Sequence, residues 1–397
     1  MSSTAAPAQE RTIPREILTL AGAFGLIFMG TGAQQQFLAP FFRETYEWTA
    51  LQRGLVPGAV YLSMTIWRVP IVWVVHRIGE RPAMLIGGAT YVLFPLAVYF
   101  IPTWWMLVAC AATWGIGATL MWVTSSIRVL DASARHHFGK SAGVFSSGTF
   151  LGLFIGTLGL SFVASTWSLR TVFLVSSIVT SLGWFLMMTL PKVETMRSKP
   201  DLRTVLSFTK SSSWRVVAAL LFLSALGYGL MLVPLGEWII VGLGVSSLAL
   251  SAGHPLARLV VALTAGWLSD RIGRRSVIVG GFLLAAAGLG LTALVPASPF
   301  ALLAGILSLG LMNGLAPTVG LAFVGDMGKR ETRLMLHSSL FANGDIGVAT
   351  AMLSGQALQV GLGGFAQTFG VFAVVLAACG IWAFFSFRER KVPASAA

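Results

Sequence analysis

The sequence alternates between long apolar runs and short charged gaps along nearly its whole length. An α-helix needs about 20 apolar residues to cross a hydrocarbon core of ~30 Å, and runs of this length recur twelve times. They lie at about 17–40, 55–76, 82–101, 105–128, 141–165, 169–190, 215–240, 248–269, 275–296, 299–323, 333–358 and 368–387. We therefore predict an all-α membrane protein with twelve transmembrane helices.

The composition excludes most classes of soluble protein. With 56% hydrophobic and only 10% charged residues, the chain has too much apolar surface for one soluble core. A net charge of +13 would suggest nucleic acid, but the basic residues cluster in the short gaps, where membrane lipid head groups are the expected partners. No metal-ligand spacing, nucleophile and base set or phosphate loop stands out. We expect a monomer that is not an enzyme and that binds no cofactor, metal or nucleic acid.

The distribution of Lys and Arg between alternate gaps predicts the orientation. If both termini are cytoplasmic, 22 of the 27 basic residues fall in cytoplasmic segments, and only Arg43, Arg53 and Arg170 fall outside. The two remaining basic residues lie within apolar runs. Both asparagines are followed by glycine, so the chain has no glycosylation acceptor, which favours a bacterial inner membrane.

The second half of the chain repeats the first. Matching residues are separated by 194 to 196 positions in the pairs Pro40 and Pro234, His76 and Asp270, Asp131 and Asp326, and Gly148 and Gly344. Such a parallel repeat is typical of transporters built from two bundles. We predict a six-helix bundle over 1–190, a charged cytoplasmic linker over 191–214 and a second six-helix bundle over 215–397.

One gap carries a specific motif, Gly266-Trp267-Leu268-Ser269-Asp270-Arg271-Ile272-Gly273-Arg274-Arg275. It resembles the loop signature of the major facilitator superfamily, glycine-x-x-x-aspartate-arginine-x-glycine-arginine-arginine, at every fixed position. A degenerate copy over 72–81 keeps Arg77, Gly79 and Arg81 but has His76 in place of the aspartate. The resemblance implies the two-bundle facilitator fold and transport by alternating access.

The same motif predicts a conformational gate on the cytoplasmic side. Acidic residues at the ends of the fourth and tenth runs are expected to pair with the signature arginines and to close the inner entrance. The predicted gate residues are Asp270, Arg271, Arg274, Arg275, Arg77, Arg81, Asp131 and Asp326.

Three ionisable residues lie inside the predicted spans. Counted at 1.5 Å per residue, Arg68, Arg258 and Asp345 are ~12 to ~18 Å from the nearest cytoplasmic gap, close to the midplane. Each charge there costs at least ~2.5 kcal/mol, so each is a candidate for function. Two guanidinium groups suit a carboxylate, nitrate or phosphate-like group, which predicts a small anionic substrate. The alternative is a structural salt bridge with Asp345.

Five uncharged or weakly basic residues complete the predicted substrate site. Gln34 and Gln35 lie in the first run, where either can contact substrate or bond a neighbouring helix. Trp114 and Tyr228 can line the cavity or pack against other helices. His254 lies one turn from Arg258, although the adjacent Pro255 gives it an equally good structural role. Protonation of Asp345 would provide proton coupling if its pairing changes during transport.

Resemblance within the superfamily favours an anion without fixing it. Arg68-Val69-Pro70 is similar to the second-span arginine of nitrate porters, and organic-anion facilitators use an eighth-span arginine. Arg258, however, precedes Asp270 by twelve residues rather than eight, and the nitrate signature is missing. The drug and proton antiporter branch is disfavoured because Gly156-Thr157 replaces its glycine-proline pair.

We therefore expect a secondary transporter of a small anion, with proton coupling as one possibility. The alternatives are an amphiphile or drug efflux transporter and a transport-inactive protein that acts as a sensor or trafficking factor. His76 in the first signature favours the last of these.

Three glycines at four-residue spacing, Gly148, Gly152 and Gly156, predict close helix packing.

Overall fold

The computed structural model describes residues 13–133, 138–192, 199–272 and 274–386. Side chains are not described at 245–246, 265–271, 274, 318–319 and 322. Helices of the first half are α1 (Arg15–Ile27), η1 (Phe28–Gly32), α2 (Ala33–Thr45), α3 (Ala50–Trp67), α4 (Ile71–Ile78), α5 (Glu80–Phe100), α6 (Trp104–Asp131), α7 (Phe138–Thr166) and α8 (Leu169–Met188). Those that follow are α9 (Leu202–Thr209), α10 (Ser212–Leu230), η3 (Met231–Leu235), α11 (Gly236–Leu243), η4 (Val245–Ala252), α12 (Gly253–Ile272), α13 (Arg274–Leu294), α14 (Pro299–Met327), α15 (Arg333–Gly361) and α16 (Phe365–Ser386).

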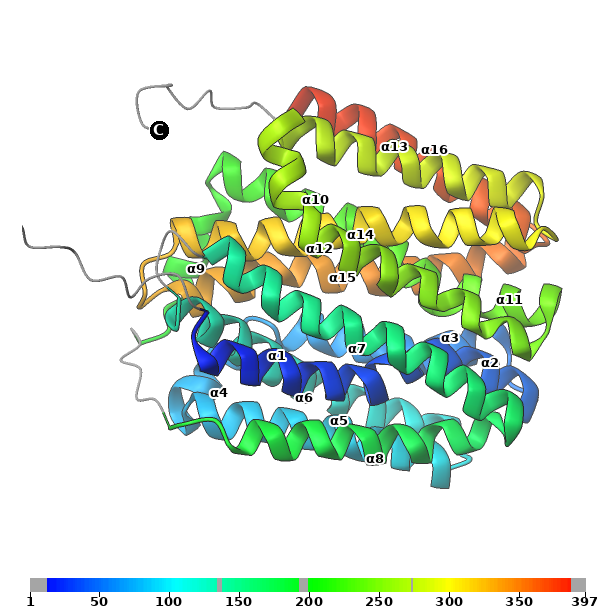
Figure 1. Ribbon diagram of the computed structural model, residues 1–397, viewed down its shortest axis with the longest axis horizontal. Coiled ribbons are helices and arrows are strands. Elements are labelled where there is room, and N and C mark those ends of the chain that lie inside the picture. The colour runs from blue at the N-terminus through cyan, green and yellow to red at the C-terminus, as the bar shows by residue number, and fades with distance from the viewer. Residues whose placement is uncertain (1–12, 134–137, 193–198, 273, 387–397) are drawn as a thin grey trace, which may run out of the picture.

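These elements form twelve membrane spans in two bundles of six. Within the described ranges, ten helices are long and apolar enough to cross a bilayer, and the bent pair of α3 and α4 makes eleven. The remaining span is α15, which has 29 residues but carries several polar side chains. Figure 1 shows α1 to α8 in one bundle and α10 to α16 in the other, with the helices running lengthwise. The fold class predicted from the apolar runs is confirmed.

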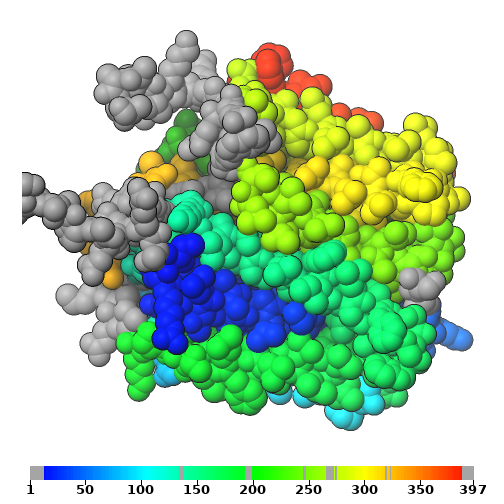
Figure 2. All heavy atoms as spheres, viewed as in Figure 1, coloured from blue at the N-terminus to red at the C-terminus, as the bar shows by residue number. Residues whose placement is uncertain are grey.

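The two bundles meet along two pairs of helices. α3 packs against α15, and α7 packs against α12. Figure 2 shows the face on which α7, in blue-green, lies beside α12, with α1 in dark blue below them. We call the end of the molecule that carries α4 and α9 the signature end, and the end that carries α11 the opposite end (Figure 1). Charged and polar side chains between these helix pairs are therefore positioned to respond to relative movement of the bundles.

The second span is broken at the position of its charged residue. α3 ends at Trp67 and α4 starts at Ile71, with a bend of 71° between them. Pro70 has no N–H to donate to the helix, and its ring crowds the preceding turn, so a break here is expected. Arg68 consequently lies at the bend, between the end of α3 and the start of α4.

The glycine stripe of α7 packs within its own bundle. A β-carbon at Gly148 or Gly152 would overlap a backbone carbonyl of α1, and one at Gly156 would overlap a carbonyl of η1, which continues the same span. The absence of side chains therefore lets α1 and α7 come into backbone contact, as the four-residue spacing predicted. The stripe holds one bundle together rather than forming the surface between the two.

The segment between the bundles contains a short helix. α9 begins after Asp201, whose carboxylate accepts hydrogen bonds from the backbone N–H of Arg203 (3.1 Å) and Thr204 (3.2 Å). This satisfies two of the four N–H groups that a helix start leaves free. α9 buries Val205 and exposes Leu202 and Leu206, so it lies along the surface of the signature end.

Candidate functional site

A cavity of about 180 Å³ lies between the two bundles at mid-height. Both halves contribute to its wall, through η1, α2, α3, α5, α6 and α7 on one side and α10, α12, α14 and α15 on the other. Six of the eight residues predicted for the substrate site line it, namely Gln35, Arg68, Trp114, Tyr228, Arg258 and Asp345. The arrangement brings together residues that are up to 310 positions apart in the chain.

Arg68 and Asp345 form a bidentate ion pair across the two bundles. Arg68 Nε donates to one carboxylate oxygen of Asp345 at 2.7 Å, and Nη2 donates to the other at 2.8 Å. The side chains are 5% and 8% exposed. This geometry gives a strong, directional contact. Because Arg68 lies on the second span and Asp345 on the eleventh, the pair joins the bundles at the centre of the molecule.

Arg258 has a different environment. Its guanidinium carbon lies 4.1 Å from the ring centre of Phe150 and 5.1 Å from that of Tyr228. Aromatic faces attract a cation, but they neutralise none of its charge. No carboxylate pairs with Arg258 in the part of the chain whose side chains are described. Arg258 thus remains a net positive charge at the cavity wall.

The unpaired polar atoms of the cavity share one property. In the described lining, each buried polar atom without a hydrogen-bond partner is a nitrogen: Arg68 Nη1, Trp114 Nε1, Arg258 Nε and His337 Nδ1. Three of the four are donors in every protonation state found at neutral pH. A buried donor without an acceptor is unfavourable, so a ligand that supplies oxygen or another acceptor would be stabilised here.

Two predicted residues lie behind the cavity wall. Gln34 is fully buried, and neither atom of its amide has a partner. His254 stacks on Tyr228, with ring centres 5.5 Å apart, and so supports that ring from behind. Gln35 faces the cavity, and its Oε1 accepts a hydrogen bond of 2.8 Å from Tyr61.

His337 is a cavity residue that the sequence analysis did not identify. It lies on α15, is 2% exposed and stacks on Phe341 with ring centres 4.3 Å apart. The sequence feature that could have identified it is its position eight residues before Asp345, because residues two helical turns apart lie on the same face of a span.

Charged side chains close the opposite end of the molecule. Glu237 on α11 is fully buried and pairs with two arginines of the other bundle, Arg53 at 3.0 Å and Arg43 at 3.4 Å. Arg53 also donates to the carbonyl of Trp48 at 2.6 Å. We call these three ionised residues, Glu237, Arg43 and Arg53, the Glu237 cluster. Glu237 lies near the end of the predicted run 215–240, and its distance along the chain from Arg43 and Arg53 gives no sign of this pairing.

A second set of ion pairs joins the bundles at the signature end. Asp131 on α6 pairs with Arg333 at 3.2 Å and with Arg330 at 3.9 Å. The guanidinium of Arg333 also lies 4.8 Å from the ring centre of Phe138. We call Asp131, Arg330 and Arg333 the Asp131 cluster. Asp131 therefore contacts the other bundle at the start of α15 and in the turn before it, and its pairing with the signature arginines stays a prediction.

The other predicted gate residues have varied surroundings. Asp326 and Arg77 are exposed and form no ion pair with the described side chains. Arg81 donates to the carbonyl of Met188 at 2.7 Å, within its own bundle. The guanidinium of Arg275 lies 3.8 Å from the ring centre of Phe384. The predicted gate residues Asp270, Arg271 and Arg274 lie outside the described side chains.

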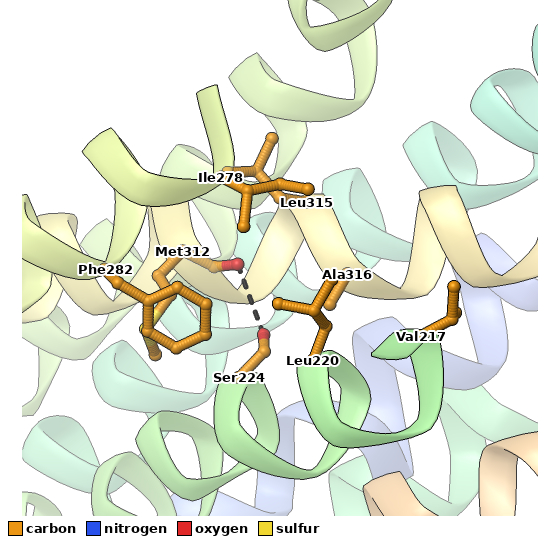
Figure 3. A pocket seen from close by; sticks show the side chains of 8 residues that line it. All are labelled: Val217, Leu220, Ser224, Ile278, Phe282, Met312, Leu315 and Ala316. Atoms are coloured by element: carbon orange, nitrogen blue, oxygen red, sulfur yellow. Dashed lines mark hydrogen bonds between the residues drawn. The ribbon is translucent and has the colours of Figure 1, made fainter. Parts of the chain in front are cut away.

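The second half also encloses a minor cavity, which is unsuitable as a substrate site. Figure 3 shows its apolar lining from α10, α13 and α14, and the hydrogen bond of 3.2 Å from Ser224 Oγ to the carbonyl of Met312. Its volume of about 10 Å³ is the space of roughly one water molecule. The cavity between the bundles is therefore the candidate site.

A membrane protein built from two helix bundles with a central cavity between them has the architecture of secondary transporters. The sequence profile of the Major Facilitator Superfamily matches residues 20–254 and, overlapping them, 217–397. The chain belongs to this family. A comparison with curated proteins finds no match.

Several solved structures have the same fold. The nucleoside transporter NupG aligns over 95% of this chain and 100% of its own, with a TM-score of 0.71 and 12% identity. A fucose:proton symporter of E. coli, FucP, aligns over 96% and 100%, with a TM-score of 0.70 and 16% identity. A structure from work on proton dependent oligopeptide transporters aligns over 94% and 98%, with a TM-score of 0.71 and 11% identity. At these identities the likeness concerns the fold, and it leaves the substrate open.

Proposed function

We propose that this protein carries a small organic anion across the membrane by alternating access, with Arg258 as the main cation for the substrate. The observation that supports this most directly is that the unpaired buried polar atoms of the described cavity wall are all nitrogens. The charges of Arg68 and Asp345 cancel, so Arg258 leaves the described lining with a net charge of +1. An anion would supply both the missing acceptors and the missing charge.

Arg68 takes a supporting part in this proposal. Two of its three nitrogens are used by Asp345, and only Nη1 remains to reach a substrate. An anion that contacts Nη1 would weaken the hold of Arg68 on Asp345. A carboxylate that loses its cation binds a proton more readily. We propose proton coupling through Asp345 on this basis.

The ion pairs at both ends suit a transporter in an occluded state. The Glu237 cluster closes the opposite end and the Asp131 cluster closes the signature end, and each joins one bundle to the other. Rocking of the bundles would have to break one cluster while the other stays formed. We place the signature end in the cytoplasm of a bacterial cell, because the gaps at this end carry most of the Lys and Arg residues.

Counterflow in proteoliposomes tests the transport step. Vesicles loaded with one unlabelled carboxylate would take up the same radiolabelled carboxylate if the protein exchanges it. Arg258→Ala should abolish uptake. Arg170→Ala is the matched control, because Arg170 is an exposed arginine that donates to the carbonyl of Tyr99 far from the cavity.

A thermal-shift screen against carboxylates, inorganic anions and lipophilic cations tests the substrate class. Anions should raise the unfolding temperature of the wild type but not of Arg258→Ala. Stabilisation by lipophilic cations alone would show that the anion proposal is wrong. Anion binding without any counterflow would instead identify a ligand-binding sensor.

A further inference from the structure

An apolar recess lies on the membrane-facing side of the molecule, next to the central cavity. It has a volume of about 590 Å³ and is formed by α7, α11, η4, α12 and α14. Its wall includes Phe154, Leu158, Leu256, Leu303 and Leu307, and Ser247 is its one residue with a polar side chain. The recess follows the seam where α7 and α12 lie side by side (Figure 2).

The helices α7 and α12 lie between this recess and the cavity. On α7, Leu153 lines the cavity and the next residue, Phe154, lines the recess. On α12, Leu256 lines the recess, and Arg258, two residues further along, lines the cavity. The ring of Phe150, which is 3% exposed, covers the guanidinium of Arg258. Phe150 precedes Phe154 by one turn of α7, so the ring over Arg258 and a ring that lines the recess lie on the same face of this helix.

We propose that the recess holds the alkyl tail of an amphiphilic organic anion whose carboxylate binds Arg258. The proposal rests on the anion transport proposed above and narrows its substrate class. A cation beside a long apolar space complements an anionic head group that carries a hydrocarbon chain. Such a molecule partitions into the bilayer and would enter between α7 and α12, with Phe150 turning away from Arg258 as the carboxylate replaces it. The rival occupant is an acyl chain of the bilayer itself.

The test uses the full-length protein in nanodiscs, with propionate and decanoate as probes and the midpoint of thermal unfolding as the readout. Leu303→Trp fills part of the recess without touching the cavity. Leu182→Trp is the matched control, since Leu182 lies on α8 and is 54% exposed on the outside of the other bundle. Overpacking should raise the concentration of decanoate that gives half of the shift roughly tenfold. The value for propionate should stay the same in both variants.

The other outcomes separate the proposal of anion binding at Arg258 from the proposal of a tail site in the recess. If both probes stabilise the protein and Leu303→Trp changes neither, the tail site is wrong and anion binding stands. If Leu303→Trp weakens decanoate but Arg258→Gln does not, the recess holds a chain independently of the cation, as a bilayer lipid would, and the proposal fails. If neither probe stabilises the wild type, carboxylate binding and the tail site fail together.

Discussion

Arg68 and Arg258 are the same residue type at a similar depth in the membrane, yet their surroundings differ. Arg68 is held by both oxygens of Asp345, whereas Arg258 is covered by the rings of Phe150 and Tyr228. A paired guanidinium stabilises one arrangement of the bundles, because its partner lies on the other half. An unpaired one is unfavourable until a counter-charge arrives. The difference supports the proposal that Arg68 stabilises the fold and that Arg258 binds the substrate.

Removing Asp345 should have the largest effect. In Asp345→Ala, Arg68 becomes a second unpaired cation in the membrane, and breaking a buried pair typically costs about 3–5 kcal/mol. We expect a marked loss of folded protein, measured by the unfolding temperature in detergent and by the yield of monodisperse material. The double variant Arg68→Met/Asp345→Leu should recover much of the stability but not the transport. Equal stability of the single and double variants would show that the pair does not join the bundles.

Replacing Arg258 should separate stability from transport. Arg258→Gln removes an unpaired cation, so the unfolding temperature should not fall, while the affinity for the anion should drop roughly tenfold to a hundredfold. Arg258→Lys keeps the charge and should retain part of the affinity, although it loses the planar donor fork. The measurements are thermal unfolding without ligand and counterflow with it. A large loss of stability in Arg258→Gln would contradict the contrast with Arg68.

The Glu237 cluster and the Asp131 cluster lie at opposite ends of the molecule, so breaking each should favour a different open state. Glu237→Gln removes the acceptor charge at the opposite end, while Arg43 and Arg53 retain access to water. We expect a shift of roughly tenfold towards states open at that end, the size typical of coupling between sites. Asp131→Asn should shift the population towards states open at the signature end.

Labelling of a cysteine in the cavity would measure this shift. Ala225→Cys faces the cavity, in a background where Cys110 and Cys379 are replaced by serine. Glu237→Gln should speed its reaction with a membrane-impermeant thiol reagent added at the opposite end. Glu47→Gln, an exposed glutamate near the same end, is the control. Faster labelling in both variants would argue against a specific role for the Glu237 cluster.

The smallest effect is expected at Asp201, an exposed carboxylate that contrasts with Asp345. The backbone N–H groups of Arg203 and Thr204 stabilise its charged form and lower its pKa. Because the folded pKa lies below the unfolded pKa, this contribution is present above the unfolded pKa and is lost as the pH falls through the folded pKa. The protection of the α9 amides, measured as their exchange rate relative to the intrinsic rate at the same pH, should therefore fall in acid, and less so in Asp201→Asn. An identical acid response in the two proteins would contradict this capping role.

The candidate site could be predicted in part. A charged residue inside an apolar run is visible in any sequence, so Arg68, Arg258 and Asp345 could be placed near the midplane from spacing alone. The ion pair could not be predicted, because Arg68 and Asp345 are 277 positions apart in the chain. From the sequence, either arginine could have paired with Asp345. Gln34 and Gln35 illustrate a second limit. Neighbouring residues on a helix differ in direction by about 100°, and only packing decided that Gln35 faces the cavity.

The sequence by itself determined the class of protein, the number of spans and the duplication. These follow from the cost of apolar surface in water and of charge in lipid, which acts on every residue independently of its distant neighbours. The tertiary structure alone decided which charges neutralise each other, that His337 joins the cavity and Glu237 closes one end, and that an apolar recess lies beside Arg258. Ion pairs and cavities form between helices, and the contacts between helices depend on how two bundles pack.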